Sequence, residues 1–217
     1  MDTNEENGLG ERHGRSPNGL GAEPESSVWL RWGLIFYAAM VGVALLWRWG
    51  VEQEPVWFVS RAAAEQGGSP GRDILLGLLV GGALVLVSNG LTSHTGWGRR
   101  LEQAMGESLG SLKVSHALVL AGASSLGEEM LFRGALQPTV GWALASLCFG
   151  LVHFVPRRDF LPWTLFAIVA GGILGGLVVW TGNLLAAVVA HAVVNGVNLP
   201  ILARRYGGQG APPPGSA

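Results

Sequence analysis

The sequence SSLGEEMLFRGAL, residues 124–136, places two glutamates and an arginine inside a run of otherwise apolar and small residues. The apolar run begins near residue 114, so its length is close to the roughly 20 residues that a helix needs to cross the hydrocarbon core of a bilayer. The stretch therefore predicts a membrane-spanning helix that carries three charges.

The composition of the whole chain favours a multi-pass membrane protein. Of the 217 residues, 49% are hydrophobic and 13% are charged, whereas soluble domains carry about 25% charged residues. The net charge of −1 gives no bulk attraction to nucleic acid. Cys148 is the only cysteine, which excludes an intramolecular disulfide and a cysteine-based zinc site.

Six apolar segments are close to the length that a membrane span requires. They cover about residues 29–49, 73–91, 114–136, 139–155, 160–180 and 184–202. Pro138 is expected to permit a turn between the third and fourth of them. Residues 96–113 mix charged and apolar positions at near-helical spacing, which predicts an interfacial amphipathic helix or a polar connector. We therefore predict an all-α fold, a polytopic transmembrane helix bundle of about six spans.

Glycines recur at a spacing of four within two of these segments. The pairs are Gly77 and Gly81, Gly171 and Gly175, and Gly172 and Gly176. This spacing lets helix backbones approach closely in lipid, so we expect these glycines to lie at helix–helix contacts inside one bundle.

The predicted spans divide the chain into four parts. These are a disordered polar tail (1–27), two helices with the amphipathic connector (28–113), a four-helix core (114–202) and a flexible tail (203–217). If the N-terminus is inside, ten Lys and Arg residues fall on the inner side of the membrane and three on the outer side. The positive-inside rule then predicts a multi-pass protein of the cell membrane with both termini in the cytoplasm.

The three charges of residues 124–136 need partners, because burying a carboxylate at mid-bilayer costs about 2.5–3.5 kcal/mol. Glu129 and Arg133 are four residues apart, the spacing at which an acid and a base on one helix meet, so we predict an ion pair. Successive helical residues point about 100° apart, so Glu128 and Glu129 are not expected to face the same neighbour. Glu128 is then available for another task.

Two other predicted spans carry polar groups that could face Glu128. The sequence FGLVH places Phe149 and His153 on one face of the fourth span, and HAVVN places His191 and Asn195 on one face of the sixth. Taken singly, each polar group is explained as a hydrogen-bonded packing residue. A carboxylate, two imidazoles and an amide around one hydrated cavity would instead satisfy one another. The combination favours a hydrolytic site.

Hydrolysis of a peptide bond needs an activated water and donors for the oxyanion that develops on the carbonyl group. Glu128 would accept a proton from the water, which His153 would orient. His191 and Asn195 would donate hydrogen bonds to the oxyanion. A second version holds a zinc ion on Glu128, His153 and His191. Since the sequence lacks the HExxH helix of common zinc proteases, we favour a site without a metal cofactor.

The motifs EEMLFR, FGLVH and HAVVN, in this order on successive apolar segments, resemble those of the CAAX prenyl protease and bacteriocin-processing family of intramembrane endopeptidases. The resemblance covers about residues 114–200. It implies that Glu128 is the general base and that Glu129 and Arg133 complete the first motif. It implies that His153 belongs to the second motif, and His191 and Asn195 to the third.

The resemblance also implies a substrate class. The family cleaves a peptide bond of a membrane-associated peptide or protein near the bilayer surface, and in its eukaryotic branch that substrate is prenylated. The best-studied eukaryotic members have eight spans, whereas six are predicted here. The resemblance therefore leaves open whether a lipidated substrate is required, and the sequence leaves the oligomeric state open.

Two other classes of protein remain open from the residues alone. In a rhomboid-like serine protease, Ser124 of the sequence GASS would attack with His191 as base, but the three charges would then have no role. A serine in a helix commonly donates to a preceding carbonyl oxygen instead. A non-enzymatic immunity protein would bind a peptide on the same scaffold, and a proton-coupled transporter would also use buried charges. The lack of an internal repeat disfavours a transporter.

Overall fold

The computed structural model describes residues 25–110 and 112–206 of the chain. Within these ranges the regular structure is helical, and the single β-type contact is an isolated bridge between Phe58 and Asn183. The elements are α1 (Glu25–Leu45), η1 (Leu46–Val51), α2 (Arg61–Gln66), α3 (Pro70–His94), α4 (Gly96–Leu109), α5 (Val114–Glu129), η2 (Met130–Leu136), α6 (Gln137–Val140), α7 (Trp142–Val152), η3 (Arg158–Phe160), α8 (Leu161–Thr181) and α9 (Leu185–Tyr206). The predicted all-α class is confirmed.

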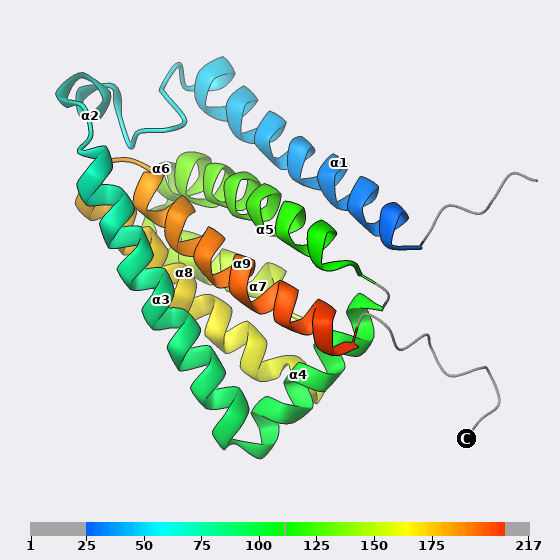
Figure 1. Ribbon diagram of the computed structural model, residues 1–217. Helices are drawn as coiled ribbons and strands as arrows, with labels where there is room; N and C mark the ends of the chain where they lie inside the picture. Colours follow the sequence, from blue (N-terminus) through cyan, green and yellow to red (C-terminus); the bar gives the residue numbers. More distant parts are fainter. Residues whose placement is uncertain (1–24, 111, 207–217) are drawn as a thin grey trace, which may run out of the picture.

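Helix α9 is the central helix of the bundle. It packs against α3, α4, α5 and α8, and its buried face is built from alanines such as Ala186, Ala187 and Ala190. In Figure 1, α9 lies between α3 and α5, and α1 flanks α5 on the outer side. Small side chains on α9 let its neighbours approach closely, which brings their polar groups within reach of one another.

Four helical segments are long and apolar enough to cross a membrane by themselves. They are Ser26–Val51, Pro70–His94, Arg158–Thr181 and Leu185–Tyr206, and they match the first, second, fifth and sixth predicted spans. The segment Val114–Val140 would be a fifth span if it is counted together with α4. The remaining predicted span corresponds to α7, which is apolar but only 11 residues long. The chain is thus a multi-pass membrane protein with four or five candidate spans by length and composition.

The turn between the third and fourth predicted spans differs from the prediction. The helix does not end before Pro138 but continues through it to Val140, and the chain turns at Gly141, whose φ is +88°. Pro138 has no backbone N–H to donate, but the preceding segment η2 is a wide π-helix whose hydrogen-bond ladder already departs from the α pattern, so the helix continues through the proline. Because the turn comes later and Pro156 follows soon after, α7 is shorter than residues 139–155.

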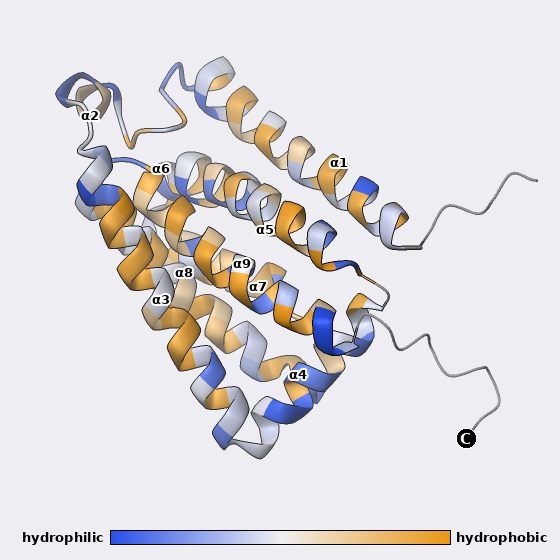
Figure 2. Ribbon diagram, in the orientation of Figure 1, coloured by the Kyte–Doolittle hydropathy of each residue, from blue (hydrophilic) through white to orange (hydrophobic). Residues whose placement is uncertain are grey.

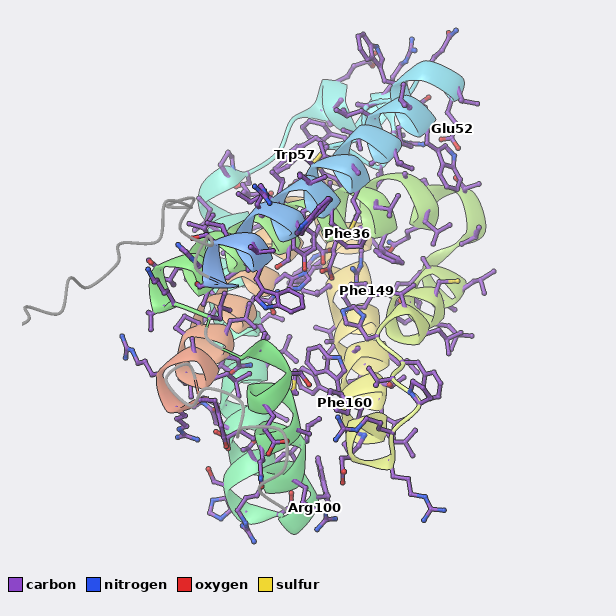
Figure 3. The ribbon with its side chains drawn as sticks, turned by 90° about the vertical axis from the view of Figure 1, so that its right-hand side faces the viewer. Phe36, Glu52, Trp57, Arg100, Phe149 and Phe160 are labelled. Atoms are coloured by element: carbon purple, nitrogen blue, oxygen red, sulfur yellow. The ribbon has the colours of Figure 1, made fainter. Side chains whose placement is uncertain are left out.

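The segments predicted to lie on the outer side of the membrane come together at one end of the bundle, which we call the α2 end. The backbone N–H of Leu184, just before α9, donates to the carbonyl oxygen of Trp57 at 3.0 Å. The hydroxyl group of Thr139 donates to Glu52 at 2.9 Å. Figure 3 shows Glu52 and Trp57 toward this end.

The segments predicted to lie on the inner side of the membrane come together at the opposite end, which we call the α4 end. Arg205 of α9 pairs with Glu102 of α4, and Arg100 of α4 lies 3.6 Å from Asp159 of the loop before α8. The hydroxyl group of Ser26, at the start of α1, accepts a backbone hydrogen bond from the residue before α5. The segments assigned to one side of the membrane therefore lie together at one end of the bundle. In Figure 3, Arg100 at the α4 end lies far from Glu52 at the α2 end. Which end is cytoplasmic stays a prediction.

Helix α4 is the helix predicted over residues 96–113. Its buried positions are small residues, Gly98, Ala104 and Gly106, and its charged residues give it the most hydrophilic stretch among the long helices (Figure 2). It packs against α3, α8 and α9 at the α4 end. Its placement at a membrane interface stays a prediction.

Two of the three glycine pairs form close helix contacts. A Cβ atom added to Gly77 or to Gly81 would lie 2.7 Å from a backbone oxygen of α9. A Cβ atom on Gly175 would lie 2.6 Å from a side-chain oxygen of α6. In the third pair, Gly172 lies at the contact with α7, since its carbonyl oxygen accepts a hydrogen bond from Nε1 of Trp142 at 2.8 Å. The prediction was wrong for Gly176, where an added Cβ atom would meet nothing within 4 Å.

Candidate active site

Helices from distant parts of the chain line one internal cavity. Glu128 of α5, His153 at the end of α7, and His191 and Asn195 of α9 surround a volume of about 210 Å³, together with Tyr37 of α1. Of these, Glu128 is 8% and His191 7% exposed. The structure therefore brings together the four residues that the sequence nominated as catalytic.

Glu128 lies opposite both imidazoles. Its Oε2 atom is 3.7 Å from Nε2 of His153 and 3.9 Å from Nε2 of His191. These distances are longer than a hydrogen bond, and Oε2 is buried without a hydrogen-bond partner among the described residues. Polar atoms separated in this way are suited to a bridging water, which can touch all three.

The contact made by Nδ1 of each imidazole determines which ring nitrogen carries the hydrogen. Nδ1 of His153 lies 2.7 Å from the carbonyl oxygen of Phe149. Nδ1 of His191 lies 2.8 Å from Oε1 of Glu129. A carbonyl oxygen and an ionised carboxylate can only accept, so in the neutral rings both Nδ1 atoms carry the hydrogen. Both Nε2 atoms then present lone pairs to Glu128, and three acceptors converge.

The charges of the first motif form a buried ion pair. Arg133 donates to Oε1 of Glu129 at 3.0 Å, and the two side chains are 1% and 0% exposed. This is the contact that the four-residue spacing predicts. Arg133 also donates to the carbonyl oxygen of Gly171 at 3.2 Å. Oε1 of Glu129 therefore contacts both Arg133 and Nδ1 of His191.

The expectation that the two glutamates face different neighbours is wrong. His191 contacts Glu129 through Nδ1 and faces Glu128 through Nε2. The 100° separation of successive helical residues does not prevent this, because the two nitrogens lie on different edges of the ring and the ring is inserted between the carboxylates.

Phe149 is the common packing partner of these groups. Its ring centre lies 4.0 Å from the guanidinium carbon of Arg133, 4.7 Å from the ring of His153 and 6.0 Å from the ring of His191. Figure 3 shows Phe149 in the interior of the bundle. The ring limits the orientations of both imidazoles and covers the ion pair with a favourable cation–π contact.

Asn195 and Ser124 form a hydrogen-bonded pair on the cavity wall. The amide Nδ2 of Asn195 donates to Oγ of Ser124 at 2.9 Å, and Ser124 donates to the carbonyl oxygen of Ala121 at 3.1 Å. The hydrogen of Ser124 is therefore committed to the backbone, as is usual for a serine in a helix. This arrangement disfavours Ser124 as a nucleophile activated by His191.

Sequence reasoning missed three aromatic residues of the cavity, Tyr37, Trp163 and Phe166. Tyr37 lies in the first span, far from the three motifs, and its one signal was a hydroxyl group inside an apolar segment. Trp163 of α8 packs edge-on against His153, with ring centres 5.5 Å apart. Nothing in its spacing distinguishes it from the other tryptophans of the chain.

A larger cavity adjoins the first toward the α4 end. It has a volume of about 350 Å³ and lies between α3, α4, α8 and α9. Aromatic and aliphatic side chains line most of it, and Glu102 and Arg205 lie on its wall. The residues shared by both cavities are Met105, Trp163, Phe166, Val194, Asn195 and Leu199.

Comparison with known proteins gives matches for the part of the chain that holds the motifs. Residues 110–197 match the family model described as "Type II CAAX prenyl endopeptidase Rce1-like". The uncharacterized protein YpbD of Bacillus subtilis (strain 168) is 38% identical over 86 residues, which are 39% of this chain and 44% of that protein. The match thus spans less than half of this curated relative. No solved structure matches the chain.

Proposed function

We propose that this chain, whose residues 110–197 belong to the Rce1-like CAAX endopeptidase family, is an intramembrane endopeptidase that cleaves a membrane-associated peptide or protein. The family suggests the reaction class. The observation that carries the proposal is the convergence of Glu128 Oε2 on the Nε2 atoms of two histidines, at 3.7 and 3.9 Å. Three acceptors around one point inside a buried cavity are suited to holding a water molecule.

The water would bridge Glu128 and one imidazole and would be activated there. It would donate one hydrogen to Glu128 Oε2 and the other to Nε2 of a histidine, which leaves an oxygen lone pair free to attack the substrate carbonyl carbon. Glu128 would take the proton as general base, and the same proton would pass to the amine when the carbon–nitrogen bond breaks. His153 would orient the water, as the sequence predicts.

The proposed role of His191 differs from the one assigned from sequence. With Nδ1 bound to Glu129 at 2.8 Å, a neutral His191 presents an acceptor at Nε2 and cannot donate to an oxyanion. His191 would instead accept the second hydrogen of the water when the carboxylic acid product ionises, and the carboxylate of Glu129 would stabilise the resulting imidazolium. The amide of Asn195 keeps an N–H group for the oxyanion.

The zinc version would use the same three side chains. Zinc holds its ligands at about 2.0–2.2 Å, so ligand atoms around it lie about 3.3 Å apart. The distances of 3.7 and 3.9 Å are longer, and among the described residues no group of three His, Cys, Asp or Glu side chains is arranged to hold a metal ion. We therefore propose the reaction without a metal.

The adjoining 350 Å³ cavity would receive the substrate. Its volume falls in the range of ligand pockets, and its largely apolar walls with a few polar groups suit an apolar peptide segment. Because this cavity lies toward the α4 end, a peptide would reach Glu128 from the side that the charge distribution predicts to be cytoplasmic. Whether the substrate carries a lipid is left to the experiment.

The test is cleavage by the purified full chain in liposomes, with a fluorogenic peptide library that includes lipidated members. We expect Glu128→Gln to lose at least about 10³-fold in kcat with an unchanged melting temperature. Glu65→Gln, on the exposed surface of α2, is the matched control and should retain full activity. A chelator that abolishes cleavage, with recovery on adding zinc, would establish the zinc version. Peptide binding without cleavage would establish the immunity or binding alternative.

A further inference from the structure

The first helix brings a phenol group to the cavity around Glu128. Tyr37 of α1 lines the same 210 Å³ cavity as the motif residues. The approach of the two helices is close at this point, because a Cβ atom on Gly127 would lie 3.0 Å from the backbone oxygen of Tyr37. Gly127 directly precedes Glu128, so the glycine lets α1 pack against the motif itself. The neighbouring Phe36 is 60% exposed and packs edge-on against the ring of Tyr37, with ring centres 5.4 Å apart.

Tyr37 interacts with two polar residues of the cavity. Its hydroxyl group interacts with the side chain of Ser124, and it lies in the field of the Glu128 carboxylate. Ser124 in turn accepts the hydrogen bond from Asn195 at 2.9 Å. The phenol, the serine hydroxyl and the amide therefore form one connected polar group beside Glu128.

The proposed hydrolysis needs donors at this place. Both histidines present acceptors toward Glu128, and the hydrogen of Ser124 is committed to the carbonyl oxygen of Ala121. Of the three residues in the connected polar group, Asn195 and Tyr37 are left to donate. A phenol O–H is a good donor, and acyl-transfer sites commonly use such groups to stabilise the oxyanion.

We propose that Tyr37 is a catalytic residue whose O–H group, together with the amide of Asn195, donates to the oxyanion of the tetrahedral intermediate. This inference rests on the proposed endopeptidase function. It adds a residue from outside the family-matched segment 110–197, so that segment does not contain the whole active site. Tyr37 forms no covalent bond; its O–H group turns from the side chain of Ser124 to the substrate oxygen.

The test is Tyr37→Phe in the full chain, assayed in liposomes with a peptide that the wild type cleaves. We expect kcat to fall by about 10²-fold, with KM within about twofold of the wild-type value. The matched control is Tyr206→Phe, which removes the same hydroxyl group from a residue that lines neither cavity and should leave kcat unchanged. The affinity for a peptide aldehyde, whose hydrate mimics the tetrahedral intermediate, distinguishes a role in stabilising the oxyanion from a purely structural role. This affinity should fall by the same factor as kcat/KM.

The outcomes separate this inference from the proposed function. If the wild type cleaves, Glu128→Gln is inactive and Tyr37→Phe keeps the wild-type kcat and aldehyde affinity, the role of Tyr37 is refuted and the endopeptidase stands. If the wild type cleaves no peptide, both proposals fail. Should Tyr37→Phe not fold, a polyfluorinated tyrosine can replace Tyr37, which is the one tyrosine left in the chain after Tyr206→Phe. The more acidic phenol should then shift the alkaline limb of the pH–rate profile to lower pH, and an unshifted limb would refute the role.

Discussion

Replacing Arg133 by methionine tests the buried ion pair around which the site is built. Arg133 and Glu129 are 1% and 0% exposed and lie 3.0 Å apart. Methionine fills much of the same volume but leaves the Glu129 carboxylate without its cation. Only the Nδ1 atom of His191, at 2.8 Å, would still contact it.

Two independent estimates give the size of the effect. Removing one partner of a buried ion pair costs about 3–5 kcal/mol, and placing an unpaired charge at mid-bilayer costs about 2.5–3.5 kcal/mol. A loss of about 3 kcal/mol in the free energy of unfolding lies within both ranges. For a chain of this size each kcal/mol lowers the melting temperature by about 2–4 °C, so we expect a fall of roughly 6–12 °C.

The measurement is thermal unfolding of the purified protein in detergent, followed by tryptophan fluorescence. The double variant Glu129→Gln/Arg133→Met removes both charges and keeps an acceptor for His191, so it should recover most of the loss. Arg100→Met is the control, since Arg100 is 66% exposed and 3.6 Å from its partner, and it should change stability by no more than about 0.5 kcal/mol. The reasoning is refuted if Arg133→Met costs no more than the control, or if the double variant is as unstable as the single one.

Three further predictions concern packing, acid stability and the serine alternative. Gly81→Ala should lose about 1–3 kcal/mol of stability through overpacking against α9, whereas Gly82→Ala, with nothing within 4 Å of its added Cβ, should not be destabilised; equal melting temperatures would contradict the close helix contact. Burial raises the pKa of the Glu52 carboxyl, but hydrogen bonds, that from Arg48 first, outweigh burial and hold this pKa below its usual value. Glu52 therefore stabilises the fold at neutral pH, and this contribution is lost as the pH falls through the folded-state pKa; Glu52→Gln should flatten the acid side of the melting-temperature curve, and an unaltered curve would contradict the contact. Ser124→Ala loses the hydrogen bond that Ser124 donates to Ala121 and the one that it accepts from Asn195. At about 1 kcal/mol each, these should leave at least about a thirtieth of the cleavage rate, and complete loss would revive the serine mechanism.

The apolar segments of the sequence predicted the bundle well because span length is set by the bilayer and is visible in composition. Four of the six predicted spans reappear as helices of spanning length. The other two did not follow from length alone. Pro138 suggested a turn, but the π-helix η2 lets the helix continue through the proline, so the chain turns at Gly141 and α7 is short.

The spacing of the charged residues predicted the contact between Glu129 and Arg133, because residues four apart on a helix are neighbours whatever the fold. It could not predict that His191 inserts between the two glutamates, since this depends on how α9 packs against α5. Tyr37 was missed for the same reason. Its contact with the cavity depends on the close approach at Gly127, which no motif in the first span announces.

If Glu128 and His153 act on one water, the kcat of the double variant can be predicted from those of the single variants. Groups that act as a unit lose their effect together, so removing the second costs little once the first is gone. The measurement is kcat for wild type, Glu128→Gln, His153→Ala and the double variant in the same liposomes, with one peptide. We predict that the double variant is within about threefold of Glu128→Gln alone. A double variant slower by the product of the two single losses would mean that the carboxylate and the imidazole act on separate events.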